Sequence, residues 1–246
     1  MSTNDSDDGL GHESVVAVVV AAGSGSRLGG ETPKALRELR GRSLVGRAVT
    51  SLASAGVTRV VVVAPVSYVD QTRAVLADLE PDVDLVVVPG GSHRQDSVRR
   101  GLAALDPEAS SDLVVLVHDA ARPLVPTQVV TRVIAAVRAG ELAVVPVVPV
   151  TDTIRAYASE AGGPARVVDR TLLRAVQTPQ GFAFSALWEA HQLALQTGAE
   201  LTDDAAVCEL AGHQVALVDG SALSFKITLP LDLALAELIC AAADPR

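Results

Sequence analysis

The sequence predicts an α/β fold: a mostly parallel, twisted sheet that is flanked by helices and carries one protruding β-arm. Two observations predict the sheet. Short valine-rich runs recur along the chain, and the stretches between them place apolar residues at helical spacing. Unbroken apolar strands of this length are typical of parallel strands buried on both faces. A third observation, the end of this alternation after Val150, predicts the arm.

The individual elements follow from the apolar pattern. Valine-rich runs predict strands at residues 15–21, 59–64, 85–88, 113–117 and 143–150, and we expect one further strand at 214–218. Apolar residues at three- and four-residue steps predict helices at 43–55, 68–79, 96–105 and 127–139, and we expect three more at 183–196, 203–211 and 231–242. Strands that alternate with helices in this way form a sheet with crossover helices.

The segment 151–174 differs from the rest of the chain. It has scattered β-forming residues, the loop Gly162-Gly163-Pro164 and no strong helical period. Its sparse apolar content would leave it poorly packed alone, so we expect this arm to lie against a partner subunit.

Composition excludes several classes of protein. The chain has 246 residues, of which 49% are hydrophobic, and its net charge is −9. This apolar fraction excludes a mainly disordered chain, and the acidic charge argues against nucleic-acid or anionic-membrane partners, which need a basic surface. Cys208 and Cys240 lack the pattern of a disulfide framework or a zinc site, so we expect free thiols.

Domain organisation and location are expected to be simple. Residues 1–13 are polar and acidic, which predicts a disordered tail and not a signal peptide, and residues 14–246 are expected to form one domain. The first apolar run is far shorter than the roughly 20 residues that cross a bilayer. We therefore expect a cytoplasmic protein without a fused second enzyme.

A glycine loop follows the first predicted strand. Residues Ala21, Ala22, Gly23 and Gly25 belong to this loop, and glycines here let backbone N–H groups approach a phosphate chain. A dinucleotide fingerprint would need glycine where Leu28 stands, and the P-loop pattern is absent. What remains is a backbone cradle for phosphates with two cations, Arg27 and Lys34.

Lysine usage adds a separate argument. Of the 20 basic residues, only Lys34 and Lys226 are lysine. A compact ammonium group on a flexible stem reaches a crowded phosphate differently from the planar guanidinium of arginine. We expect both lysines to serve one site. The alternative is that the two lysines occur by chance and share no role.

Two further segments come after predicted strands. Asp119 follows the fourth strand and could hold Mg²⁺ against nucleotide phosphates, or could simply cap the next helix. Gly90 belongs to a second glycine turn that could present its backbone and Ser97 to a base ring, or could be structural. The acids in Thr202-Asp203-Asp204 suit a helix N-cap equally well.

These motifs together resemble the 2-C-methyl-D-erythritol 4-phosphate cytidylyltransferase family of the non-mevalonate isoprenoid pathway. The likeness runs from about residue 15 to 242, and its most specific segment is His118-Asp119-Ala120-Ala121-Arg122-Pro123. The other matching segments are Ala21 to Leu28, Pro33-Lys34, Gly90 to Val98, Asp152-Thr153, Thr178-Pro179-Gln180, Thr202-Asp203 and Lys226-Ile227-Thr228.

The resemblance implies a Rossmann-like fold of the nucleotide-diphospho-sugar transferase type and transfer of CMP from CTP to methylerythritol phosphate. It implies that the arm mediates a homodimer. It also implies a role for each matching residue: Arg27, Lys34 and Lys226 in catalysis, Gly90 and Ser97 in selecting cytosine, Asp119 at Mg²⁺ and the phosphates, and Thr153, Arg170 and Thr178 at the polyol phosphate.

Some positions depart from the family pattern, and other functions stay open. Val20 and Ala35 stand where proline and glutamine are common, and Ser224 stands where some members have an acid or amide. A cytidylyltransferase for another polyol phosphate, such as ribitol 5-phosphate, is one alternative. A CTP-sensing module without catalysis is another, but it would not need three cations together with Asp119.

Overall fold

The computed structural model describes most of the chain, namely residues 14–23, 28, 32–77, 79, 83–105, 113–159 and 162–243. The expected disordered tail, residues 1–13, lies outside this part.

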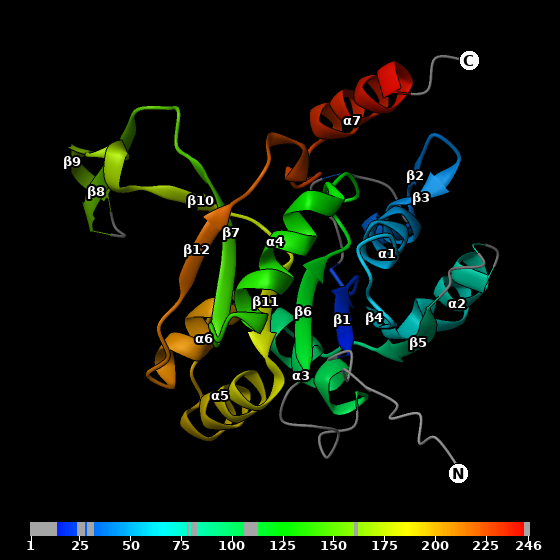
Figure 1. The fold of residues 1–246 in the computed structure, drawn as a ribbon. Coiled ribbons are helices and arrows are strands. Elements are labelled where there is room, and N and C mark those ends of the chain that lie inside the picture. Colours follow the sequence, from blue (N-terminus) through cyan, green and yellow to red (C-terminus); the bar gives the residue numbers. More distant parts are fainter. Residues whose placement is uncertain are drawn as a thin grey trace, which may run out of the picture.

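A mixed eight-stranded sheet forms the centre of the molecule (Figure 1). Its strands follow the order β10-β7-β11-β6-β1-β4-β5, and β12 pairs with β7. They are β1 (Val15–Val20), β4 (Arg59–Ala64), β5 (Asp84–Pro89), β6 (Val114–Asp119), β7 (Ala143–Pro149), β10 (Arg174–Val176), β11 (Gln180–Ala183) and β12 (Ala216–Asp219). The mostly parallel sheet that the sequence predicts is thus confirmed.

Two antiparallel strands were not predicted. β11 lies between β6 and β7 and is antiparallel to both, and β10 is antiparallel to β7. The sequence of β11, Gln180-Gly181-Phe182-Ala183, lacks the apolar run on which the prediction depends. A side chain at position 181 would contact Val133 of α4 at 2.4 Å, so glycine allows this helix to pack closely on the strand.

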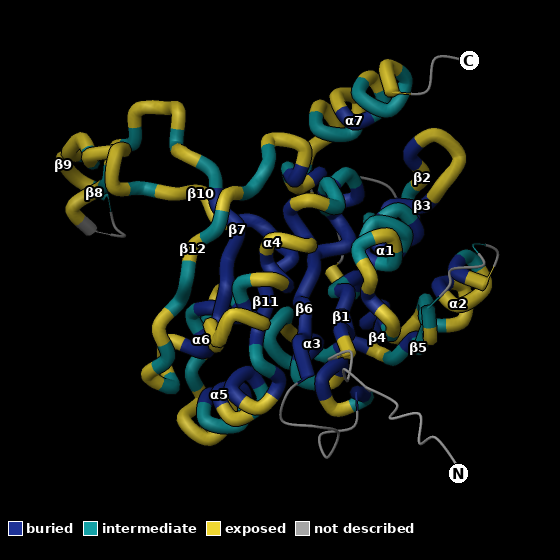
Figure 2. Tube along the Cα trace, viewed as in Figure 1, coloured by how far each residue is buried: buried dark blue, intermediate teal, exposed yellow. Residues whose placement is uncertain are grey.

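Helices cover both faces of the sheet. They are α1 (Leu44–Ala53), α2 (Val69–Ala77), α3 (Arg94–Ala103), α4 (Thr127–Arg138), α5 (Phe184–Thr197), α6 (Asp204–Leu210) and α7 (Pro230–Ala243). Side chains alternate along each strand, so Ala17 and Val19 pack with α1 and α4, whereas Val16 and Val18 pack with α3 and α5. Figure 2 shows the resulting buried centre in dark blue.

A smaller apolar cluster packs the C-terminal segment against a short hairpin outside the central sheet. Leu39, from the hairpin β2 (Glu38–Leu39) and β3 (Arg42–Ser43), packs with Leu28, Ile227 and Ala236 of α7. This hairpin is too short for the apolar pattern to predict. The cluster matters for the site because it buries Ile227, which follows Lys226, and Leu28, which follows the glycine loop.

The arm is a two-stranded hairpin of β8 (Ile154–Ser159) and β9 (Gly162–Val168), which confirms its β-structure. Figure 1 shows it projecting away from the main sheet. Its apolar side chains are unusually open to solvent: Tyr157 is 70% exposed, and Leu172, between β9 and β10, is 82% exposed.

In the part of the chain that the structure describes, every helix is too short or too polar to span a bilayer.

Candidate active site

A cavity of about 480 Å³ opens at the carboxyl ends of β1 and β6. The chain leaves β1 toward β4 and β5 on one side and returns to β6 on the other, so the cavity lies where the direction of strand addition reverses. Ligands of open α/β sheets bind at such switch points. The lining residues are Val20, Ala21, Ala22, Gly23, Lys34, Ala35, Gly91, Ser92, His93, Arg94, Ser97, Asp119, Ala120, Ala121, Lys226 and Thr228.

The two lysines of the chain line this one cavity. Lys34 begins a short 3-10 helix (Lys34–Leu36) directly after Pro33. Lys226 comes from the other end of the sequence, and its neighbour Ile227 is fully buried and donates its backbone N–H to the carbonyl of Ala121 at 2.8 Å. The expectation that both lysines face one site therefore agrees with their positions.

Asp119 is the electrostatic centre of the cavity. It is the last residue of β6, and its side chain is 11% exposed. Lys226 Nζ lies 2.8 Å from Asp119 Oδ2, Arg94 Nε lies 3.6 Å from Oδ1, and Arg122 Nε lies 3.8 Å from Oδ2. Burial alone would raise the pKa of Asp119, but these cations, Lys226 first, hold the pKa well below its usual range.

Arg122 connects the Asp119 turn to the segment before Lys226. Its Nη1 donates to the carbonyl of Ser224 at 2.7 Å, and its Nη2 donates to the carbonyl of Val176 in β10 at 3.3 Å. Burial and the neighbouring Arg94 lower the pKa of Arg122, while Asp119 opposes this shift. One guanidinium thus joins three segments around the cavity.

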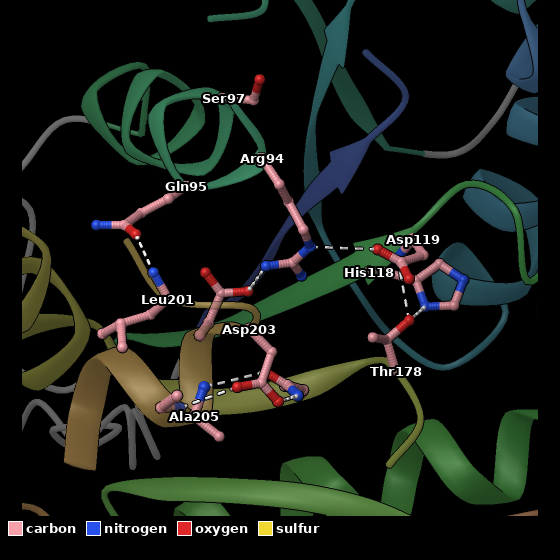
Figure 3. A network of polar contacts seen from close by, with 12 residues as sticks. Arg94, Gln95, Ser97, His118, Asp119, Thr178, Leu201, Asp203 and Ala205 are labelled. Atoms are coloured by element: carbon pink, nitrogen blue, oxygen red, sulfur yellow. Dashed lines mark hydrogen bonds and ion pairs between the residues drawn. The ribbon is translucent and has the colours of Figure 1, made fainter. Parts of the chain in front are cut away.

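His118 and Thr178 lie behind Asp119 and hold it in place (Figure 3). Thr178 Oγ1 accepts the backbone N–H of Asp119 at 3.0 Å and lies 3.0 Å from His118 Nδ1. Burial lowers the pKa of His118 to about 4, so the ring is neutral at pH 7. Thr178, which the resemblance places at the polyol phosphate, is buried and is not among the described residues that line the cavity.

The second glycine turn is tightly built around Ser97. A side chain at position 90 would meet Ala22 Cβ at 2.6 Å, so glycine is required where this turn touches the first loop. Ser97 Oγ accepts the N–H of Gly91 and donates to the carbonyl of His93, both at 3.0 Å. Ser97 lines the cavity together with Gly91, whereas Gly90 is not among the described residues that line it.

Sequence reasoning gave no role to Arg94, which the structure places in the cavity wall at the start of α3. Its Nη1 lies 2.7 Å from Asp204 Oδ2, opposite its contact with Asp119. Burial would lower the pKa of Arg94, but Asp204 and Asp119 together raise it. The only sequence signal was its place within the family-like segment Gly90 to Val98.

The structure gives a position for only two of the four remaining candidate residues. Gly25 and Arg27 lie outside the described residues. Thr153 and Arg170 are exposed and lie on the arm, where Arg170 Nη1 donates to the carbonyl of Thr151. Neither of these two residues is among the described residues that line the cavity.

The side chains of the cavity suit a metal ion that is bound mainly by the phosphates of a substrate. In the described part of the chain, no three histidine, cysteine or acidic side chains are grouped to hold a metal ion. Mg²⁺, however, often binds through one or two carboxylates together with substrate phosphates. Asp119 fits this pattern because, among the described residues, its Oδ1 has only the longer contact to Arg94.

Known proteins resemble this chain over most of its length. The model of the family IspD, 2-C-methyl-D-erythritol 4-phosphate cytidylyltransferase, matches residues 15–242. A protein with that name from Streptomyces coelicolor is 49% identical over 92% of this chain and 84% of its own length, and one from Frankia casuarinae is 47% identical over 94% and 83%.

Solved structures show the same likeness. The crystal structure of 2-C-methyl-D-erythritol 4-phosphate cytidylyltransferase from Thermus thermophilus is 39% identical, covers 91% of this chain and 97% of its own, and has a TM-score of 0.72. A match of this extent in sequence and fold leads to one conclusion: the chain belongs to the 2-C-methyl-D-erythritol 4-phosphate cytidylyltransferase family.

Proposed function

We propose that the cavity at β1 and β6 binds CTP and transfers CMP to 2-C-methyl-D-erythritol 4-phosphate. The products are 4-diphosphocytidyl-2-C-methyl-D-erythritol and pyrophosphate, on the path to isoprenoid precursors. One observation carries this proposal: in a chain with a net charge of −9, the only two lysines line the same cavity, and one of them contacts a strand-end carboxylate. An acidic protein that binds a triphosphate needs such a local basic site.

The nucleotide is placed by the two glycine turns. Ala22, Gly23 and Gly25 are assigned to the phosphates through their backbone N–H groups, because this loop follows a parallel strand at the switch point. Ala21 belongs to the same loop, but its N–H donates to the carbonyl of Val63 at 2.8 Å, so it is assigned only to the wall of the nucleotide site. The turn at Gly90 and Ser97 is assigned to the cytosine ring. Its rigidity supports this role, since Ser97 is held by two hydrogen bonds and glycine is required at position 90.

The reaction needs no nucleophile from the protein. A phosphate oxygen of the polyol phosphate attacks the α-phosphorus of CTP, the new P–O bond forms, and the bond to the β-phosphate oxygen breaks so that pyrophosphate leaves. The protein must hold two anionic reactants in line and offset their repulsion. Lys34, Lys226 and Arg27 are assigned to this role as catalytic residues, with Lys226 oriented by Asp119.

A divalent metal ion completes the charge balance. Enzymes of this family are generally dependent on a divalent metal, and we assign Asp119 as the carboxylate that would hold Mg²⁺ together with the CTP phosphates. When bound, Mg²⁺ would neutralise phosphate charge. The contacts of Arg94 and Lys226 with Asp119 keep that carboxylate ionised, as a metal ligand must be.

The arm is assigned to the partner subunit of a homodimer. Thr153 and Arg170 lie on the arm and would reach the polyol phosphate in the other subunit's cavity, whereas Thr178 acts from within the same chain through Asp119. Exposed apolar side chains such as Leu172 support a covered arm, because such a surface is costly in water. The acidic chain suggests no nucleic-acid or membrane partner, and we place it in the cytoplasm.

Pyrophosphate release tests the function. The purified chain with Mg²⁺ is offered each of the four nucleoside triphosphates with either methylerythritol phosphate or ribitol 5-phosphate. We expect release only with CTP and methylerythritol phosphate. Release with ribitol 5-phosphate at equal efficiency would identify the other polyol substrate, and binding of CTP without release in any pair would identify a sensor.

A further inference from the structure

A line of charged and polar side chains runs from the cavity into the interior. The line begins at Asp119, which contacts Arg94. Arg94 Nη1 lies 2.7 Å from Asp204 Oδ2, and Asp204 Oδ1 lies 3.2 Å from His191 Nε2. Figure 3 shows Arg94 extending from α3 toward Asp119. The Asp204 and His191 side chains are 1% and 0% exposed, so this part of the line is inside the protein.

Asp204 is not explained by the folding of its own helix. The N-cap of α6 is Asp203, whose Oδ1 accepts the N–H of Ala206 at 3.0 Å. The side chain of Asp204 turns inward instead and has one partner for each oxygen, Arg94 and His191. A buried carboxylate is costly unless it is paired, so a charge at this place needs a reason beyond helix capping.

The backbone around Asp204 is fixed on both sides. Gln180 Nε2 donates to Asp203 Oδ2 at 2.8 Å, and Gln180 Oε1 accepts the N–H of Ala205 at 3.2 Å. Gln95, next to Arg94, accepts the N–H of Leu201 at 3.0 Å. Because these hydrogen bonds hold the backbone at Asp204 in place, the position of its carboxylate determines where the guanidinium of Arg94 lies.

The charges around Asp119 show what the contact between Arg94 and Asp204 accomplishes. Three cations, Lys226, Arg94 and Arg122, lie within 3.8 Å of the single carboxylate Asp119. A second carboxylate behind Arg94 gives that cation its own partner and leaves the 2.8 Å contact with Asp119 to Lys226. Without it, Arg94 would compete with Lys226 for Asp119.

We propose that Asp204 is a positioning residue that holds Arg94 at the nucleotide side of the cavity, and that His191 fixes the second oxygen of Asp204. This inference rests on the proposed function of the cavity as a CTP site. Arg94 lines that cavity beside Ser97, so the loss of Asp204 weakens the binding of CTP and not of the polyol phosphate.

The test is the variant Asp204→Asn, which keeps the shape and removes the charge. CTP binding is measured by titration calorimetry, and KM is measured separately for both substrates. We expect CTP binding about 10- to 100-fold weaker, as is typical when the support of a ligand-holding side chain is lost. KM for the polyol phosphate should stay within about twofold. His191→Leu should show the same pattern more weakly, and His191→Gln, which keeps an N–H donor, should restore most of the affinity.

A double-mutant cycle separates positioning from folding. In an Arg94→Gln background, Asp204→Asn should cause no further loss of CTP affinity, because its only effect passes through Arg94. The matched control is Cys208→Ala, which changes a fully buried residue one turn later on α6 and should leave CTP affinity unchanged. Thermal unfolding is followed for every variant.

The outcomes are distinct. If folded Asp204→Asn binds CTP as tightly as the wild type, the inference is overturned and the proposed function is not. The same holds if Asp204→Asn weakens CTP binding in the Arg94→Gln background as much as it does in the wild type. If Asp204→Asn does not fold, the comparison of Arg94→Gln with the double variant, which removes both charges together, decides the question in the same way. A wild-type chain that binds no CTP overturns the proposed function and this inference with it.

Discussion

The cavity and the arm place their polar residues in opposite ways. At the cavity, Asp119, Lys226 and Arg94 contact one another and are held by the same chain. On the arm, Thr153 and Arg170 are exposed, and apolar side chains such as Leu172 face solvent. We infer that one chain completes the nucleotide half of the site by itself, whereas the polyol-phosphate half is complete only with a second chain.

The largest effect is expected from the two lysines. Lys226→Ala and Lys34→Ala should each lower kcat on the order of 10²–10³, which is the usual cost of losing one preorganised group that stabilises developing charge. Both variants should remain folded, because neither side chain lies in an apolar cluster. Steady-state pyrophosphate release and circular dichroism measure the two properties.

Arg73→Ala is the matched control, since Arg73 is an exposed cation whose ion pair with Asp70 lies on the surface of α2. Its kcat should equal that of the wild type. Near-normal turnover in both lysine variants would show that the cavity is not the catalytic centre.

The arm is tested by mixing two inactive variants. Arg170→Ala damages the site to which the arm contributes, and Lys226→Ala damages the site in its own chain. Random exchange makes half of the dimers mixed, and each mixed dimer has one intact site, so the mixture should regain about a quarter of wild-type activity. No recovery after demonstrated subunit exchange would mean that Arg170 acts within its own chain.

The sequence predicts some parts of the fold better than others. Strands with continuous apolar runs and the chemical groups at their ends could be predicted, because the carboxyl ends of parallel strands share one edge of the sheet. Asp119 was singled out in this way, whereas Lys34 was singled out by its place after the glycine loop and by the scarcity of lysine. β11 could not be predicted, since Gln180 and Gly181 interrupt its apolar pattern.

The pairing of Arg94 with Asp204 could not be predicted either. These residues lie far apart in the sequence, and only the tertiary fold brings the first turns of α3 and α6 together, so that Arg94 Nη1 lies 2.7 Å from Asp204 Oδ2. Two adjacent acids at a helix start were a signal, because a helix needs only one N-cap. The structure shows that Asp203 is that cap and leaves Asp204 for Arg94.

The buried ring of His118, next to Asp119, predicts that the stability of the folded chain depends on pH. The pKa of His118 is about 4 in the folded chain and 6.5 ordinarily, so between these values the unfolded chain binds the proton and the folded chain does not. The stabilisation is therefore complete above about pH 6.5 and is lost as the pH falls toward 4, by about 2 kcal/mol between pH 7 and pH 5.

Urea unfolding of the wild type and of His118→Asn at pH 7 and pH 5 measures this difference. The variant should lose about 2 kcal/mol less than the wild type over that interval, because the other titrating groups are common to both chains. An equal loss in the two proteins would mean that the His118 ring is not kept neutral by burial.

The smallest effect on folding is expected on the arm. Leu172→Ser should change the free energy of unfolding of the chain by no more than about 0.5 kcal/mol, since the side chain is 82% exposed. The proposed homodimer, however, should dissociate about tenfold more readily in analytical ultracentrifugation, because the variant removes an apolar side chain from the arm that we assign to its interface. Leu195→Ser, at an exposed leucine on α5, is the control and should leave dissociation unchanged.

A crystal structure with CTP and Mg²⁺ tests most directly whether the lysine-lined cavity is the nucleotide site. We predict the triphosphate between Lys34 and Lys226, with both Nζ atoms at hydrogen-bond distance from phosphate oxygens and the cytosine against the turn at Gly90 and Ser97. A triphosphate bound elsewhere, with both lysines out of its reach, would contradict the function assigned to this cavity.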